Sequence, residues 1–363
     1  MTSFVKLNDP SRKFTEPRIN LDEIKELILK GPYLNGPHTE KFEFHLSNYL
    51  EIDDVIMVSS GTDAIKLSIQ ALEIPIGKKI GIATNAGGYA QIAAKLAGVD
   101  IQYMEIDENG LLDLELFMST WTPEIFAIIV TNLFGQSVEV QKIRDFCDER
   151  RIIIIEDCAQ SIGSFTNGKA TGCYSHISTF SFYPTKNLST VGDAGAVATK
   201  NSNLSEKIRA LREYGWKDKY NSTIRNGSNS RNDELHAAIL LSQLKFLDED
   251  IADRKAIWNK YRQAASAGNL QLIGNEASDF SCHLCVIKTS HRDQFMKYMK
   301  DLGIDTGIHY PKLDYQQRAF DKTEKKFPIS EKWVQQIVTV PLFTKMSLSE
   351  VDIVEKALRE FEI

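Results

Sequence analysis

The sequence lacks the features that mark membrane, secreted and nucleic-acid-binding proteins. Its 363 residues contain no run of about 20 apolar residues, so no membrane-spanning helix is expected. The first 14 residues have no apolar signal core, which favours a cytoplasmic protein. The five cysteines are an odd number spread along the chain, which argues against a disulfide framework. The formal net charge of −6 argues against nucleic acid as a partner.

Signatures of several other sites are also missing. There is no GxGxxG after a strand, no HExxH and no GxSxG. Residues 163–170 approach a phosphate-binding P-loop, but Ala170 stands where Ser or Thr must bind magnesium, so a surface hairpin is expected. Cys282 and Cys285 lie three apart in a strand-like run, where their side chains would point to opposite faces. Since zinc needs four converging ligands, we expect both cysteines to be structural and predict no metal site.

Apolar runs alternate with helical patterns between about residue 40 and residue 200. Four consecutive isoleucines at 152–155 suit a strand that is buried on both faces. Strands that alternate with helices predict an α/β fold with a mainly parallel sheet covered on both sides. Strands are expected at 80–83, 126–131, 152–155, 177–182 and 194–199, and helices at 63–72, 89–97 and 140–150, after a first helix between Asn20 and Gly31.

The length favours two domains, at roughly 150 residues each. Residues 234–261 have a helical pattern almost throughout and are expected to bridge the domains. Beyond them, a strand-like run at 283–289 and two helical patterns predict a smaller α+β domain. We therefore expect a large domain over residues 1–249, including an N-terminal arm, and a small C-terminal domain over residues 250–363.

Two segments suit the binding of a phosphorylated, electron-withdrawing cofactor. Ser59, Ser60, Gly61 and Thr62 lead into a helix, whose N-terminus offers free amides and a positive dipole to an anion. Asp157 directly follows the isoleucine strand, at the kind of strand end where α/β proteins bind ligands, and could meet a buried cation. A plain capping turn and an Asp N-cap are the structural alternatives for these two segments.

Two further segments fit the same task. Thr179 and Ser181 share one face of a strand that Pro184 ends, and Lys186 follows in a loop that contains glycine. A lysine beside a bound cofactor can form a Schiff base if its pKa is lowered, whereas an isolated lysine would be a solvated surface residue. Residues 227–234 offer polar groups and a second helix N-terminus to an anion.

In this order and at these spacings, the segments resemble the DegT/DnrJ/EryC1/StrS family of pyridoxal-phosphate (PLP)-dependent aminotransferases of nucleotide-linked sugars. The resemblance covers about residues 30 to 360 and includes SSGTDAIKLSIQAL, IIEDCAQSIGS, SFYPTKNL and GIDTGIHYP. It implies a large PLP-binding domain with a mixed sheet, as in aspartate aminotransferase, and a small C-terminal domain. It also implies transfer of an amino group from L-glutamate to a nucleotide-linked keto-sugar, such as a keto-6-deoxyhexose, in amino-sugar biosynthesis for polysaccharides such as O-antigen or for natural products.

The resemblance assigns the catalytic roles and most of the cofactor contacts. Lys186 matches the Schiff-base lysine, which also moves a proton, and Asp157 matches the carboxylate that pairs with the pyridine nitrogen. Gln160 matches a residue near the ring hydroxyl. The phosphate cradle is implied to consist of Gly61, Thr62, Ser181 and, from a neighbouring subunit, Asn229.

A homodimer with shared active sites follows from that last match. The residues expected to line or approach the sugar pocket are Tyr183, Tyr214, Arg231, His309 and Tyr310. For the last two, a purely structural role in holding the C-terminal domain stays open.

One segment departs from the family pattern. The aromatic residue that stacks on the cofactor ring in many members falls on Gly87 here, so either Tyr89 swings in to stack or the ring face is covered otherwise. Lys186 argues against the family's dehydratases, which have histidine at that position, and the intact set of cofactor residues argues against a scaffold without turnover. The aminated sugar carbon, the nucleotide and the stereochemistry are left open.

Overall fold

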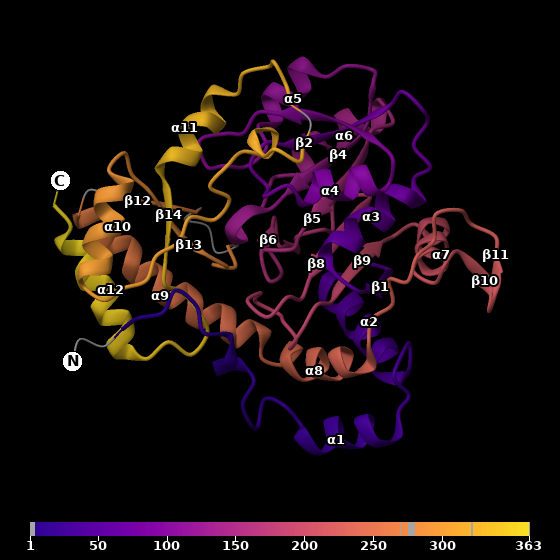
Figure 1. Ribbon diagram of the computed structural model, residues 1–363, viewed down its shortest axis with the longest axis horizontal. Coiled ribbons are helices and arrows are strands. Elements are labelled where there is room, and N and C mark those ends of the chain that lie inside the picture. Colours follow the sequence, from indigo (N-terminus) through magenta and orange to yellow (C-terminus); the bar gives the residue numbers. More distant parts are fainter. Residues whose placement is uncertain (1–3, 269, 275–279, 321, 363) are drawn as a thin grey trace.

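The computed structural model describes residues 4–268, 270–274, 280–320 and 322–362. A large lobe surrounds a seven-stranded sheet of order β1-β9-β8-β5-β4-β2-β3, and a small lobe contains a three-stranded sheet (Figure 1). The pairs from β3 to β8 are parallel, whereas β9 is antiparallel to both of its neighbours, so the predicted mixed, mainly parallel sheet is confirmed. The strands are β1 (Asp54–Val58), β2 (Lys79–Ala83), β3 (Asp100–Met104), β4 (Ile125–Thr131), β5 (Ile153–Asp157), β8 (Ile177–Ser181) and β9 (Gly195–Thr199).

Alternating residues bury both faces of this sheet. In β1, Val55 and Met57 join one apolar cluster, while Ile56 and Val58 join another on the opposite face. In β5, Ile154 and Ile155 divide in the same way, so the isoleucine run is buried on both faces as predicted. The helices of this lobe are α1 (Leu21–Lys30), α2 (Pro37–Leu50), α3 (Gly61–Ala71), α4 (Tyr89–Leu96), α5 (Leu114–Thr120), α6 (Gln141–Glu149), α7 (Ser202–Leu211) and α8 (Glu234–Leu244).

The prediction of one long helix over residues 234–261 is wrong in one respect. The structure has two helices, α8 and α9 (Leu247–Ala267), because Phe246 has φ −108° and ψ 1°. No glycine or proline marks this break; packing sets it, since Leu247 lies in the core of the large lobe whereas Tyr261 lies in the core of the small lobe. The predicted domain boundary at residues 249 and 250 falls inside α9 and stays a prediction.

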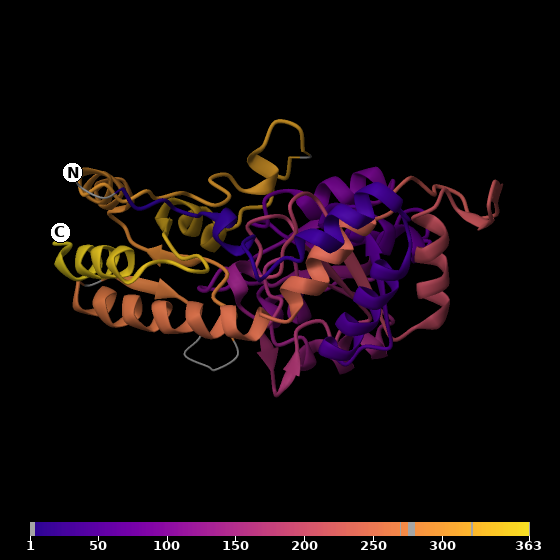
Figure 2. The same cartoon turned by 90° about the horizontal axis from the view of Figure 1, so that it is seen from below.

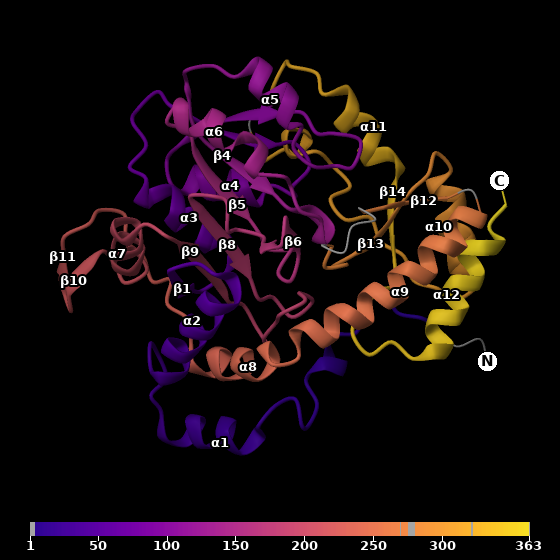
Figure 3. The ribbon, with the colours of Figure 1, turned by 180° about the vertical axis from the view of Figure 1, so that it is seen from behind.

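The small lobe lies at the opposite end of the molecule from the hairpin of β10 (Trp216–Asp218) and β11 (Asn221–Ser222) (Figures 1 and 3). Its antiparallel strands are β12 (Gln271–Ile273), β13 (Cys285–Lys288) and β14 (Ile337–Val340). They pack with α9, α10 (Arg292–Asp301) and α12 (Leu348–Glu360), and α11 (Pro328–Gln336) leads into β14. The expected α+β arrangement is therefore present.

Two sequence motifs have structural explanations. Residues 163–170 form the predicted hairpin, with β6 (Phe165–Thr166) and β7 (Lys169–Ala170) joined by a turn of positive φ. Cys282 and Cys285 are buried, free thiols in a single apolar cluster. The expectation of opposite faces is wrong for them, because Cys282 has φ 51° and precedes β13.

An N-terminal arm over residues 4–20 joins the two lobes. Figure 2 shows it in indigo, running from the small lobe towards the large one. Val5 pairs with Ile304, Arg12 makes two hydrogen bonds of 2.7 Å to Glu350 of α12, and Arg18 pairs with Asp250 of α9 at 2.8 Å. These contacts fix the arm against the small lobe before it reaches the base of the large one.

Candidate active site

A cavity of about 540 Å³ lies where the carboxyl ends of β4, β5 and β8 meet the small lobe. The N-terminus of α3, the turn after β8 and residues of the small lobe complete its wall. Ten residues singled out from the sequence line it: Gly61, Thr62, Tyr89, Asp157, Gln160, Ser181, Tyr183, Lys186, His309 and Tyr310. The packing of the two lobes thus brings these ten residues together although they are up to 249 positions apart, from Gly61 to Tyr310.

The N-terminus of α3 forms one end of the cavity. Ser60 caps this helix by accepting from the amide of Asp63 at 3.1 Å, and the first helical bond runs from the Ala64 amide to the Ser60 carbonyl. The amides of Gly61 and Thr62 precede that bond and are available to an anion. A Cβ on Gly61 would lie 2.7 Å from Cβ of Ser181, so glycine is needed for this close approach.

Asp157 is a buried carboxylate at the end of β5. Its Oδ1 accepts from the amide of Ala159 at 3.0 Å, as the capping alternative predicts, and its Oδ2 accepts from Oγ1 of Thr131 at 3.5 Å. Burial raises its pKa, against the opposing effect of the Ala159 amide and of Lys186. A cationic group in the cavity would stabilise the charged carboxylate, so the residue fits a protonated pyridine nitrogen.

Lys186 follows β8 and reaches the same cavity. Its side chain is partly exposed, and the surface that it exposes faces this cavity. Desolvation lowers its pKa to about 8, and the charge of Asp157 opposes this shift. A lysine with this pKa has a sizeable fraction of neutral, nucleophilic amine near neutral pH.

Gln160 and Tyr310 connect the two lobes across the cavity. Oε1 of Gln160 accepts from the amide of Phe134 at 2.7 Å, which fixes the amide group, and its Nε2 donates to Oη of Tyr310 at 2.7 Å. A Cβ on Gly87 would lie 2.4 Å from the Tyr310 ring, and Tyr89 meets that ring edge-on at 6.2 Å. Tyr310 therefore takes the space that a side chain at position 87 would need.

Two neutral histidines line the cavity, one of which was missed from the sequence. Nδ2 of Asn187 donates to the Ser281 carbonyl at 2.9 Å, so its Oδ1 must accept and Nδ1 of His283, 3.3 Å away, is the donor. Nε2 of His283 is left as an acceptor. Burial holds its pKa far below the usual value and lowers the pKa of His309 to about 4.

From the sequence, His283 was only one residue of a strand-like run, between the two cysteines. The signal that it offered was a histidine directly before an apolar stretch. Leu7 and Asn8, which bring the N-terminal arm into the cavity wall, carried no signal of their own.

Three predicted site residues, Asn229, Tyr214 and Arg231, lie outside the cavity wall. Together they belong to a surface stretch over residues 214–231, here called the outer segment. Nε of Arg231 donates to Oδ1 of Asn229 at 3.1 Å, and its guanidinium lies 5.6 Å from the centre of the Tyr214 ring. Asn229 and Tyr214 are exposed. Within one chain these groups do not join the residues around Lys186.

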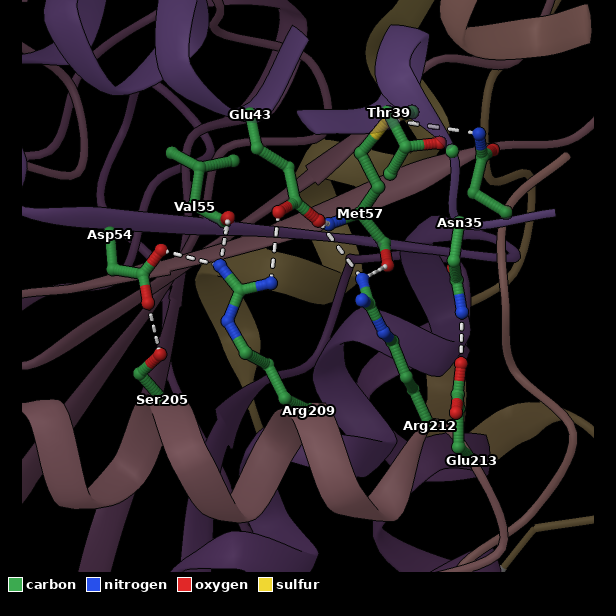
Figure 4. A network of polar contacts seen from close by, with 12 residues as sticks. Asn35, Thr39, Glu43, Asp54, Val55, Met57, Ser205, Arg209, Arg212 and Glu213 are labelled. Atoms are coloured by element: carbon green, nitrogen blue, oxygen red, sulfur yellow. Dashed lines mark hydrogen bonds and ion pairs between the residues drawn. The ribbon is translucent and has the colours of Figure 1, made fainter. Parts of the chain in front are cut away.

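A network of ion pairs holds the base of the outer segment (Figure 4). Glu43 of α2 accepts from Arg209 and Arg212 at 2.9 Å each, and Arg209 also donates to Asp54 of β1 at 2.6 Å. Arg212 donates to the Met57 carbonyl at 2.8 Å, and its own carbonyl accepts from the amide of Ser230 at 2.9 Å. The outer segment is therefore tied to the sheet, even though Asn229 and Tyr214 are exposed.

Within the described residues, no three His, Cys, Asp or Glu side chains gather in a way that could hold a metal ion. The same part of the chain contains no helix that is both long and apolar enough to cross a membrane.

Comparison with known proteins agrees with this geometry. The model of the DegT/DnrJ/EryC1/StrS aminotransferase family matches residues 17–359. A dTDP-3-amino-3,4,6-trideoxy-alpha-D-glucose transaminase from Streptomyces venezuelae is 31% identical, with 99% of this chain and 97% of the relative covered. The solved structure of S. venezuelae DesV, in complex with a ketimine intermediate, matches with a TM-score of 0.94 at 31% identity over 99% of both chains.

A third comparison concerns the cofactor. NtdA from Bacillus subtilis, solved with bound PMP, matches with a TM-score of 0.91 at 29% identity, over 99% of this chain and 85% of its own. PLP chemistry is thus supported as a property of the family. Since the family match spans nearly the whole chain, the resemblance is confirmed, and this protein is an aminotransferase of the DegT/DnrJ/EryC1/StrS family.

Proposed function

We propose that this enzyme uses PLP to transfer an amino group from L-glutamate to the keto group of a nucleotide-linked sugar, such as a keto-6-deoxyhexose. The observation that carries the proposal is one cavity that contains a lysine of lowered pKa, a buried carboxylate and a free helix N-terminus. Each of these groups suits a different part of a phosphorylated pyridine aldehyde. The S. venezuelae relative, named as a transaminase of a dTDP-linked amino sugar, supports the class of acceptor.

The residues present fit the cofactor in three ways. Gly61, Thr62 and Ser181 offer amides and a hydroxyl to the phosphate, and the absence of a side chain at Gly61 lets Ser181 lie close beside it. The buried carboxylate of Asp157 pairs with the ring nitrogen. Bound there, PLP supplies an electron sink for the carbon that loses a proton. Lys186 holds the cofactor covalently and, when released, carries that proton on its Nζ.

The small lobe supplies the other wall of the site. Gln160 is fixed by the Phe134 amide, so its Nε2 and the Oη of Tyr310 form a rigid polar pair beside the ring. Tyr183 and His309 also line the cavity, and His309 is neutral at physiological pH. Neutral polar groups suit sugar hydroxyls, whereas the diphosphate of a nucleotide requires a cation.

That cation, we infer, is Arg231 of a second copy of the chain. Asn229, Tyr214 and Arg231 face outward on a firmly held segment, as residues that complete a partner's site would. Large apolar side chains are exposed beside the cavity mouth and on the N-terminal part of the large lobe: Leu29, Tyr33, Leu34, Tyr183 and Val191. A two-fold dimer that covers this surface would form two shared sites.

The test is the visible spectrum of the purified protein with PLP, before and after addition of L-glutamate. The proposal predicts an absorption band of lysine-bound PLP that glutamate converts to the band of the amine form. A band that glutamate leaves unchanged would contradict glutamate as the donor. Absence of any band would contradict a role for Lys186 and favour a scaffold without turnover. A panel of dTDP-, UDP- and GDP-linked keto-sugars, added to the amine form, then identifies the acceptor by return of the first band.

A further inference from the structure

Lys13 of the N-terminal arm lies directly beneath the turn that carries Lys186. It is 3% exposed and ends a short 3₁₀ turn, Pro10–Lys13. Its Nζ donates to the carbonyl of Lys186 at 3.0 Å, to the carbonyl of Asn187 at 2.5 Å and to Oγ of Ser189 at 3.2 Å. Lysine is rarely buried to this extent unless its charge is satisfied.

The three contacts match an ammonium group. Lysine in its charged form has three N–H donors and no acceptor, and here each donor has an oxygen within hydrogen-bond distance. A neutral amine has only two N–H donors, and among these three groups its lone pair could accept only from the Ser189 hydroxyl. Burial, followed by the nearby charge of Arg254, lowers the pKa of Lys13 to about 7, so a large part of the population carries the ammonium at neutral pH.

The charged groups around Lys13 are themselves held by other partners, and its backbone is bound by α8. Arg18 of the arm pairs with Asp250 of α9 at 2.8 Å, and Arg254 of α9 donates to the carbonyls of Cys282, His283 and Leu342. Nε2 of Gln243 donates to the carbonyl of Lys13 itself. The backbone of Lys13 is thus bound by α8, while its side chain donates hydrogen bonds to the turn after β8.

The turn that Lys13 contacts, residues 186–189, also contacts the cavity wall. Asn187, whose carbonyl binds Lys13, uses its side chain to orient His283 in the cavity wall. Leu7 and Asn8 of the same arm also line the cavity. The arm therefore contributes to the site twice, once through its wall and once from below Lys186.

We propose that Lys13 is a positioning residue that clamps the turn of Lys186 and so sets the place and proton affinity of its Nζ. This inference rests on the proposed function of Lys186. Desolvation lowers the pKa of Lys186, and the contacts of Lys13 hold its turn in that desolvated place. Loss of Lys13 lets the turn loosen and is therefore expected to raise the pH midpoint of the absorption band of lysine-bound PLP. For the same reason, kcat is expected to fall about tenfold or more, with less change in KM for glutamate.

The experiment compares Lys13→Met and Lys13→Arg with the wild-type holoenzyme. Lys13→Met keeps the apolar stem and removes the donors, and we expect the raised midpoint and the lower kcat. Lys13→Arg keeps charge and donors, so the midpoint should return to within a few tenths of a pH unit of the wild-type value. Lys6→Met is the matched control, because Lys6 lies in the same arm but is exposed and pairs only with Asp9 among the described contacts; it should match the wild type.

A folded Lys13→Met enzyme with a wild-type midpoint and kcat would overturn the proposal. If Lys13→Met does not fold, Ser189→Ala decides, because it removes one of the three acceptors: a smaller shift of the same sign supports the clamp and wild-type behaviour overturns it. If the wild-type protein itself gives no band with PLP, the failure lies in the proposed function and not in the role of Lys13.

Discussion

The cavity and the outer segment were both assigned to the active site from the sequence, but within one chain they lie apart. Around the cavity, Asp157, Lys186 and the start of α3 meet because parallel strands bring their carboxyl ends to one edge of the sheet. The outer segment is also held firmly, through Arg212, but Asn229 and Tyr214 are exposed and, like Arg231, do not line the cavity. Residues that were predicted to serve one chemical task therefore do not all converge within one chain.

The largest effect is expected from the centre of the cavity. Lys186→Ala removes both the covalent attachment of PLP and the group that moves the proton, so activity should fall by more than about 10⁴-fold. The spectrum of the variant with PLP should lack the band of lysine-bound cofactor. Retained activity would show that Lys186 has no essential catalytic role. Partial rescue of the variant by added methylamine would support the role of Lys186 as a base.

Asp157→Asn tests the buried carboxylate with little change in shape. The amide can still accept from the Ala159 amide, but it cannot hold a proton on the ring nitrogen, so kcat should fall by about 10²–10³-fold. PLP should remain bound, which absorbance measures. A kcat close to the wild-type value would mean that the ring nitrogen pairs with another group.

The outer segment should behave differently from the cavity when two variants are mixed. Asn229→Ala and Lys186→Ala are each expected to be inactive or nearly so as homodimers. Subunit exchange at equal amounts makes half of the dimers mixed, each with one native site, so about one quarter of wild-type activity should return. No recovery, with exchange proven by mass spectrometry, would place Asn229 outside the partner's site.

The lowered pKa of Lys186 predicts a pH dependence for loading of the apoprotein. The neutral amine is the nucleophile, so the rate of PLP attachment should rise with pH and level off above about 8, the pKa of Lys186. Stopped-flow absorbance measures this rate. A rate that still rises at pH 10 would show that Lys186 titrates like a lysine in water.

The smallest effect concerns Gly87 and its contact with Tyr310. Gly87→Ala and Gly98→Ala both place a side chain at positive φ, which costs about 1–2 kcal/mol in unfolding free energy. Only the first places its Cβ against the Tyr310 ring, because Gly98 faces open space. We therefore expect Gly87→Ala alone to weaken glutamate or acceptor binding, measured as a several-fold rise in KM. Equal kinetics in both variants would mean that Tyr310 has no role in the site.

Regular features of the fold could be predicted from the sequence, and features set by packing could not. The run at 152–155 predicted a strand buried on both faces, because isoleucine offers no polar group to solvent. The break before Leu247 was not predictable, since no glycine or proline marks it. The edge strand β3 was missed, although Asp100 and Gln102 alternate with Ile101 and Tyr103 as in a half-buried strand, because the alternation is only five residues long.

The same division holds for the site. Lys186 and Asp157 stand in motifs with a local signature, at a strand end and in a glycine-containing loop. Lys13 and His283 have no such signature, because side-chain partners of both come from distant segments: the turn after β8, 173 or more residues from Lys13, and Asn187, 96 residues from His283. Tyr310 was predicted by resemblance, but its contact with Gly87 depends on how the two lobes meet.

The measurement that tests the central claim most directly is a map of where PLP attaches. Desolvation lowers the pKa of both Lys13 and Lys186, but Lys13 is buried, and of the two only Lys186 lines the cavity. The holoenzyme is reduced with borohydride, digested and analysed by peptide mass spectrometry. The account predicts the pyridoxyl phosphate label on Lys186 in wild-type protein and its loss in Lys186→Ala. A label on Lys13, on another lysine or on none would contradict it.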